Sequence, residues 1–155
     1  MPSKTDIARI RWLIRDDMPA IMEIERENPE PWTMEEFEEQ LRQRNCVGEV
    51  CEIKGQIAGF LIYEFKKSTN TIINIAVKKD CRRALIGSYM VDKLIRTTHN
   101  SKRDSIELTL QESNLPGLYF FKSLGFQATG IYRELYENGD DGIAMEYLRG
   151  QKTGV

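Results

Sequence analysis

Apolar and polar residues alternate along this chain in two patterns, one typical of strands and one typical of helices. Short apolar runs bounded by turn residues predict strands at residues 8–14, 47–53, 56–65, 71–77, 105–110, 128–133 and 143–148. Helices are predicted where apolar residues recur every three or four positions: after Asp16 or Asp17, after Thr33, from Ile86 to His99, and from Ser113 or Asn114 onward.

Capping residues mark the first two helices. Asp16 or Asp17 can cap the first helix, which has Pro19 in its first turn. Thr33 and Glu36 form a capping box that opens the second. The residues of this second helix expected to point inward are Met34, Phe37 and Leu41.

Turn residues mark the other boundaries. Lys54–Gly55 predicts a tight turn between two strands, and Asn138–Gly139 predicts the tip of a final hairpin. Gly125 suits the left-handed position that ends the last helix, and Phe126 suits the apolar contact beyond it.

The predicted order of elements is β-α-α-β-β-β-α-β-α-β-β. It combines an antiparallel meander with a strand–helix–strand crossover, which requires a mixed sheet with helices on its faces. We therefore predict an α/β (α+β) fold with about seven mostly antiparallel strands and about four helices. The 155 residues suffice for a single domain, residues 1–155.

Composition excludes several classes of protein. The net charge of −2 argues against general nucleic-acid binding, and no apolar run approaches the roughly 20 residues of a membrane span. The first residues lack the apolar core of an export signal, so we expect a cytoplasmic protein without a membrane partner. The three cysteines and single histidine lack metal-ligand spacing, so we expect no metal and give His99 no catalytic role.

Residues 74–88 carry the most specific chemistry. A buried strand leads through a short basic loop into the N-terminus of an amphipathic helix, where unpaired N–H groups and the helix dipole attract anions. Arg82 and Arg83 add two cations, which favours a phosphate or pyrophosphate.

This segment resembles the acyl-CoA pyrophosphate loop of the GNAT acetyltransferase superfamily. Residues 82–87 (Arg-Arg-Ala-Leu-Ile-Gly) match the loop, Ile75-Ala76-Val77 matches the strand before it, and Leu85 stands where the family has its first glycine. Residues 30–33 resemble the entry to the second helix in RimI-type enzymes, which acetylate the N-terminus of a ribosomal protein. Residues 114–126 resemble a further motif of the family, and residues 132–136 followed by 141–145 resemble its last hairpin. The similarity covers about residues 8 to 149.

The resemblance implies attack of an amine on the thioester of acetyl-CoA. The strand edge at 75–77 would bind the pantetheine arm, and the backbone amides from Arg83 to Ser88 would bind the pyrophosphate. Asn114 would contact the pantetheine, although a helix N-cap explains an Asn there equally well. The candidate cofactor residues are Ile75, Ala76, Val77, Arg82, Arg83, Ala84, Leu85, Ile86, Gly87, Ser88, Asn114 and Phe121.

The family's proton-transfer residues are replaced here. Its general base and general acid correspond to Thr109 and Phe121, and neither side chain can do that work at neutral pH. Tyr119, two residues before Phe121, should point elsewhere on the helix. The candidate catalytic residues are therefore Glu107, which shares a strand face with Thr109 and can act through water, and Tyr132 and Tyr136, which can flank the acceptor.

The resemblance supports an N-acetyltransferase whose acceptor is a primary amine, most simply a protein N-terminus. Acetylation of a small-molecule amine is an alternative, and so is a CoA-binding or interaction module with weakened catalysis. Residues 23–39 hold eight glutamates against one arginine, a charge that can attract a cationic acceptor or simply form a solvated helix face. Either a monomer or a homodimer is compatible with the sequence.

Overall fold

The computed structural model describes residues 7–150, except for the side chains of residues 83 and 84. The described residues divide into two compact units. The first consists of residues 7–65 and 72–94, and the second of residues 66–71 and 95–150. Strand β4 and helix α3 each contribute residues to both units.

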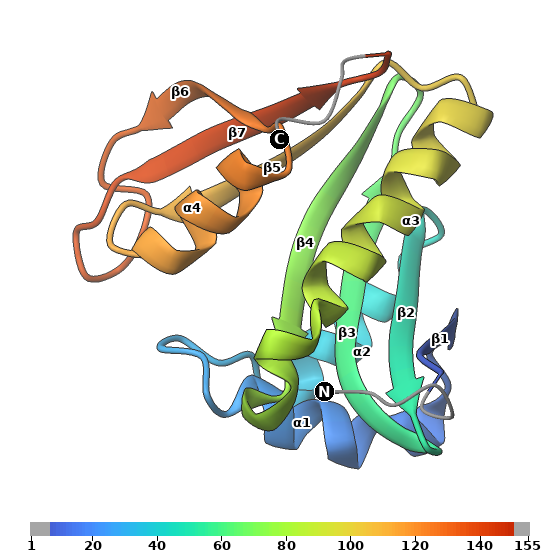
Figure 1. The fold of residues 1–155 in the computed structure, drawn as a ribbon. Coiled ribbons are helices and arrows are strands. Elements are labelled where there is room, and N and C mark those ends of the chain that lie inside the picture. Colours follow the sequence, from blue (N-terminus) through green and yellow to red (C-terminus); the bar gives the residue numbers. More distant parts are fainter. Residues whose placement is uncertain (1–6, 151–155) are drawn as a thin grey trace. The chain divides into compact units, whose positions relative to one another are not determined.

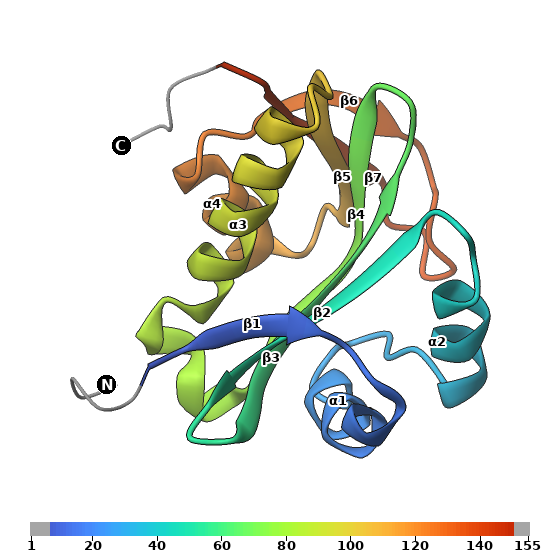
Figure 2. The same cartoon turned by 90° about the vertical axis from the view of Figure 1, so that its right-hand side faces the viewer.

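The first unit is an antiparallel sheet with helices on both faces. Its elements are β1 (Arg9–Trp12), a 3-10 turn (Arg15–Asp17), α1 (Met18–Glu25), α2 (Met34–Leu41), β2 (Cys46–Ile53), β3 (Gln56–Phe65), most of β4 (Thr69–Val77), the 3-10 segment η2 (Lys79–Ala84) and the start of α3 (Ile86–Asn100). Helices α1 and α2 lie on one face of these strands and the start of α3 lies on the other (Figure 1 and Figure 2).

Alternate side chains of β2 and β3 pack against the two helical layers. Val50, Phe60 and Ile62 are buried with Ile21 of α1 and Phe37 of α2 in one apolar cluster. This alternation is the reason that a single central strand can support helices on both faces.

The second unit contains β5 (Ser105–Gln111), α4 (Leu115–Ser123), β6 (Gln127–Tyr132) and β7 (Gly142–Leu148), together with the first residues of β4 and the end of α3. Strand β5 pairs in parallel with the start of β4 and antiparallel with β7, which pairs in turn with β6. Phe121, Phe126 and Tyr147 are buried in contact with one another and form an aromatic core.

The strand order is β1-β2-β3-β4-β5-β7-β6 in a seven-stranded sheet. Only the β4–β5 pair is parallel among the pairings described. The predicted mixed, mostly antiparallel sheet with four α-helices is thus confirmed over residues 7–150.

Most predicted boundaries are confirmed, and two side chains differ from the prediction. Thr33 accepts from the Glu36 N–H at 3.1 Å, as a capping box requires, and Gly125 has a φ of 99° at the end of α4. Asp17 occupies the N-cap position of α1, as predicted, but its side chain makes no capping hydrogen bond to that helix and instead accepts from Arg11 and from the Ile14 N–H. Met34, predicted to point inward, is 39% exposed at the first position of α2.

Candidate functional site

The end of β4 and the start of α3 form a tightly bonded turn in the first unit. The Lys78 N–H donates to the Ala58 carbonyl at 2.7 Å, which fixes the end of β4 to β3. The Cys81 N–H donates back to Lys78 at 2.8 Å, and Arg82 Nε donates to the Val77 carbonyl at 3.2 Å. The Arg82 side chain is exposed and lies beside the strand end, where its charge can face an anion.

Leu85 has a left-handed backbone between η2 and α3. Its φ is 60° and its ψ is 26°, a conformation that glycine adopts readily and that a residue with a Cβ rarely adopts. Its carbonyl accepts the first hydrogen bond of α3, from the Tyr89 N–H at 3.0 Å. The backbone therefore takes the path that a glycine would give, and the leucine side chain projects outward, 70% exposed.

Gly59 allows the start of α3 to approach the sheet. A Cβ at this position would lie 2.9 Å from the Ala76 carbonyl oxygen, 3.1 Å from Met90 Cε and 3.3 Å from Ile86 Cγ2. The first N–H groups of an α-helix have no partners within the helix. Gly59 thus helps to place the N-terminal end of α3 next to the end of β4.

The remaining sequence-predicted residues of this unit surround the same turn. Ile75, Ala76 and Val77 are half-buried on β4, Ile86 is buried beneath the helix, and Gly87 and Ser88 are half-buried in its first turn. Arg83 and Ala84 belong to η2, but their side chains lie outside the described part of the structure.

Asn114 caps α4 in the second unit. Its Oδ1 accepts from the Gly117 N–H at 3.0 Å, which confirms the N-cap interpretation. A Cβ on Gly117 would lie 2.7 Å from Asn114 Nδ2, so this close cap depends on the glycine. The side chain is exposed.

Glu107 and Thr109 share one face of β5, as predicted. Thr109 is exposed and Glu107 half-buried, whereas Ile106 and Leu108 are buried on the other face. Glu107 lies opposite Glu146 of β7 in the antiparallel register. Two carboxylates thus stand side by side at the position where proton transfer is expected.

Phe121 lies in the aromatic core and not at the surface. It is 1% exposed, with its ring centroid 5.1 Å from that of Phe126, whereas Tyr119 is 67% exposed. The prediction that Tyr119 and Phe121 point to different sides of the helix is confirmed. Of the two, the residue with a hydroxyl group, Tyr119, faces solvent.

Tyr132 and Tyr136 lie at the end of β6 and in the loop that follows. Tyr132 is exposed and Tyr136 half-buried. Asp141 fixes this loop, because its carboxylate accepts from Arg133 at 3.1 Å and from the Glu134 N–H at 2.9 Å, and its carbonyl accepts from the Glu112 N–H. The two tyrosines are therefore carried on a structured segment.

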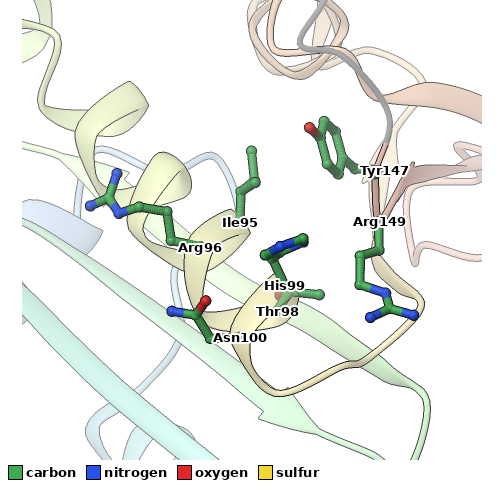
Figure 3. Close-up of a pocket in the computed structure, with 8 residues that line it drawn as sticks. Ile95, Arg96, Thr98, His99, Asn100, Tyr147 and Arg149 are labelled. Carbon is green, nitrogen blue, oxygen red and sulfur yellow. The ribbon is translucent and has the colours of Figure 1, made fainter.

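A separate pocket of about 370 Å³ opens at the end of α3 in the second unit (Figure 3). His99, Arg96 and Thr98 of the helix and Tyr147 and Arg149 at the end of β7 line it. None of the candidate site residues does so. Among residues 7–150 no group of acidic, histidine or cysteine side chains is arranged to hold a metal, and no helix is long and apolar enough to cross a membrane.

Comparison with known proteins agrees with these features. The sequence profile described as the Acetyltransferase (GNAT) family matches residues 10–126, which include the β4–η2–α3 turn, β5 and α4. The chain belongs to the GNAT acetyltransferase family. It is therefore an acetyltransferase by family.

Two relatives illustrate the place of this GNAT chain in the family. An uncharacterized N-acetyltransferase of Methanocaldococcus jannaschii is 30% identical over 147 residues, which cover 88% of each chain. The ribosomal protein bS18-alanine N-acetyltransferase of Escherichia coli is 29% identical over 133 residues, covering 83% of this chain and 89% of the relative.

Solved GNAT structures share the fold. The crystal structure of the ribosomal-protein-S18-alanine N-acetyltransferase from Escherichia coli superimposes with a TM-score of 0.84 at 25% identity, covering 94% of this chain and 96% of that one. Ard1 from Thermoplasma volcanium gives a TM-score of 0.85 at 20% identity, covering 93% and 99%.

Sequence reasoning missed a buried polar cluster in this GNAT chain. Glu25 is fully buried, and its carboxylate accepts from Asn74 of β4 and from the Trp32 backbone. The sequence pattern includes Glu25 only as one of the eight glutamates of residues 23–39. Its spacing from the buried Met18 and Ile21, at i+7 and i+4, places it on the inward face of α1 and is the signal that was available.

Proposed function

We propose that this protein transfers the acetyl group of acetyl-CoA to a primary amine, with a protein N-terminal α-amino group as the acceptor. The observation that carries the proposal is the β4–η2–α3 turn, in which Leu85, where the resemblance puts the family's first glycine, has a left-handed backbone that glycine adopts readily. The bS18-alanine N-acetyltransferases among the relatives support the choice of acceptor.

The chain's own groups supply binding and orientation. The edge of β4 at Ile75, Ala76 and Val77 binds the pantetheine arm, and a backbone N–H there stabilises the oxyanion that develops on the thioester. The amides of residues 83–88 and the Arg82 side chain bind the pyrophosphate. Holding both reactants in line can supply about 7–11 kcal/mol of the barrier reduction.

Proton transfer falls to groups of the second unit. Glu107 accepts the amine proton through water, and Tyr132 or Tyr136 lies beside the acceptor. General acid–base catalysis typically contributes about 10²–10⁴-fold, so an enzyme without the family's usual pair at Thr109 and Phe121 retains a substantial rate. The Glu107→Gln variant should lower kcat with little change in the affinity for acetyl-CoA.

Calorimetric titration with acetyl-CoA, and with desulfo-CoA for comparison, tests the cofactor. We expect micromolar binding that weakens in Arg82→Ala and is unchanged in Arg96→Ala, which removes another exposed arginine, on α3. An absence of binding at millimolar ligand would overturn the acetyltransferase proposal.

An acceptor screen then separates two classes of substrate. Peptides with a free N-terminal alanine should be acetylated at the α-amino group, as mass spectrometry of the products would show. If small amines are acetylated and peptides are not, the acceptor is a metabolite. A ribosomal-protein acceptor would place the reaction in the cytoplasm.

A second candidate is a CoA-binding module that has lost catalysis, and the buried Phe121 is the observation that favours it. The Phe121→Tyr variant distinguishes the two. In a weakened enzyme the added hydroxyl should raise turnover, whereas in a binding module acetyl-CoA binds and no variant turns over. Because the family match spans residues from both units, we propose that they act together as one GNAT domain.

A further inference from the structure

The buried carboxylate of Glu25 is the least expected group in the first unit. It is the last residue of α1 and is 0% exposed, and none of the ion pairs between described side chains includes it. Removing an ionised carboxylate from water costs several kcal/mol unless it is paired or well hydrogen-bonded. The burial of the Glu25 carboxylate therefore depends on the hydrogen-bond donors around it.

Three N–H donors surround this carboxylate, two from the segment between α1 and α2 and one from β4. The Trp32 backbone N–H and Asn74 Nδ2 both donate to Oε2 at 3.0 Å, and Asn28 Nδ2 lies 3.4 Å from Oε1. Trp32 immediately precedes α2, and Asn74 is the residue before Ile75 on β4. One side chain thus joins the end of α1, the segment entering α2 and the central strand.

Because Asn74 lies next to residues 75–77, its hydrogen bond with Glu25 also affects the candidate functional site. The next three residues, 75–77, form the strand edge to which we assign the pantetheine arm. The segment fixed to Asn74 therefore lies beside the acyl end of that arm. Its residues between Arg26 and Trp32 are exposed and include Glu27 and Glu30, whose charge suits a cationic amine.

We propose that Glu25 is a positioning residue that holds the segment of residues 26–33 against β4 and so shapes the acceptor site. This inference rests on the proposed acetyltransferase function. The hydrogen bonds to Oε2, and not the charge itself, do the positioning. A glutamine can keep both of them through its carbonyl oxygen, and an alanine keeps neither.

Steady-state kinetics with an accepted peptide amine tests the proposal. Glu25→Ala should raise the acceptor KM about tenfold or more, with kcat lowered less and the acetyl-CoA affinity within about twofold, because the lost contact orients the acceptor and not the cofactor. Glu25→Gln should stay within about twofold of the parent protein.

A matched control variant distinguishes a loss of positioning from a general loss of stability. Glu49 is also a buried carboxylate, 3% exposed, but lies on β2 and pairs with Lys93 of α3. Glu49→Ala should lower the melting temperature as Glu25→Ala does and leave the acceptor KM unchanged. An equal rise of KM in both variants would overturn the positioning role.

Exchanging the donor and the acceptor of the hydrogen bond between Asn74 and Glu25 provides a further test. Asn74→Asp places a second carboxylate against Glu25 and should raise the acceptor KM. Adding Glu25→Gln supplies an amide donor for the new carboxylate, but the Trp32 N–H loses its acceptor when that amide turns toward residue 74, so KM should recover only in part. Failure of the double variant to recover, with both proteins folded, would count against the tether.

Hydrogen exchange requires no turnover, so it tests the positioning role of Glu25 separately from the proposed acetyltransferase function. Hydrogen exchange of the Trp32 amide should accelerate in Glu25→Ala and stay slow in Glu25→Gln and Glu49→Ala, because only the first removes its acceptor. Unchanged protection in Glu25→Ala would disprove the tether whatever the activity. Correct protection without any acetylation would instead refute the proposed function.

Discussion

At the scale of single residues, Leu85 combines a backbone conformation suited to glycine with an exposed apolar side chain. A left-handed backbone costs a residue with a Cβ about 1–2 kcal/mol. Such strain persists where the surrounding contacts impose it, and here β4 and α3 fix both ends of the turn. The leucine therefore leaves the path of the loop intact and changes the surface that a ligand meets.

Replacing Leu85 by glycine should raise the free energy of unfolding by about 1 kcal/mol, because the strain is relieved, and tighten acetyl-CoA binding severalfold by allowing closer approach. Thermal denaturation and calorimetry measure the two effects. Lys102→Gly is the matched control, since Lys102 has a φ of 58° at the other end of α3. It should gain similar stability with unchanged affinity. Weaker binding in Leu85→Gly would mean that the leucine contacts the cofactor favourably.

Asp17 provides a pH-dependent contribution to stability. Its carboxylate accepts from Arg11 at 2.8 and 2.9 Å, and this hydrogen bonding, first among several causes, lowers its pKa from 3.8. A carboxyl group with a lowered folded-state pKa stabilises the fold above its ordinary pKa, and the contribution is lost as pH falls through the lowered value.

Asp17→Asn should therefore reduce the free energy of unfolding by about 1–3 kcal/mol at pH 7, and the difference from the parent should shrink below about pH 4. Urea denaturation at several pH values measures this. Asp16→Asn changes the exposed neighbour and should have little effect at any pH. A difference that stays constant down to pH 3 would show that the ion pair does not provide the stability.

At the scale of elements, the placement of α3 depends on Gly59. Gly59→Ala should cost about 1–3 kcal/mol of stability and weaken acetyl-CoA binding, since the new methyl group would meet the Ala76 backbone and shift the first turn of the helix. Denaturation and calorimetry test both. Gly130→Ala, where a Cβ meets nothing within 4 Å, should leave both quantities unchanged. If Gly59→Ala is destabilised but binds acetyl-CoA with normal affinity, the position of α3 does not determine cofactor binding.

The elements themselves could largely be predicted because their signals are local. The Thr33–Glu36 box, the Lys54–Gly55 turn and the glycine after α4 each depend on residues within a few positions of one another, and all three are confirmed. The role of Asp17 could not be predicted, because its partner Arg11 belongs to a different element and competes with the helix for the carboxylate. Long-range pairing of this kind leaves no periodic pattern.

At the scale of the whole molecule, some residues of the candidate site can be recognised from short sequence motifs, whereas others become partners only in the folded chain. The loop at residues 82–88 and the cap at Asn114 could be recognised from short motifs, since backbone groups do much of their chemistry. Glu25 and Asn74 are 49 positions apart and become partners only in the folded sheet. The roles of Glu107, Tyr132 and Tyr136 remain predictions because they require a bound acceptor.

The candidate cofactor residues belong to both units, with residues 75–77 and 82–88 in the first and Asn114 in the second. Bound acetyl-CoA should therefore slow hydrogen exchange in both, at the start of α3 and at the Gly117 amide that Asn114 caps. Adenosine diphosphate, which lacks the pantetheine arm, should protect only the start of α3. Protection confined to α3 with the complete cofactor would remove Asn114 from the site. Protection in both units would mean that the pantetheine arm joins them in one binding reaction, as a single catalytic domain requires.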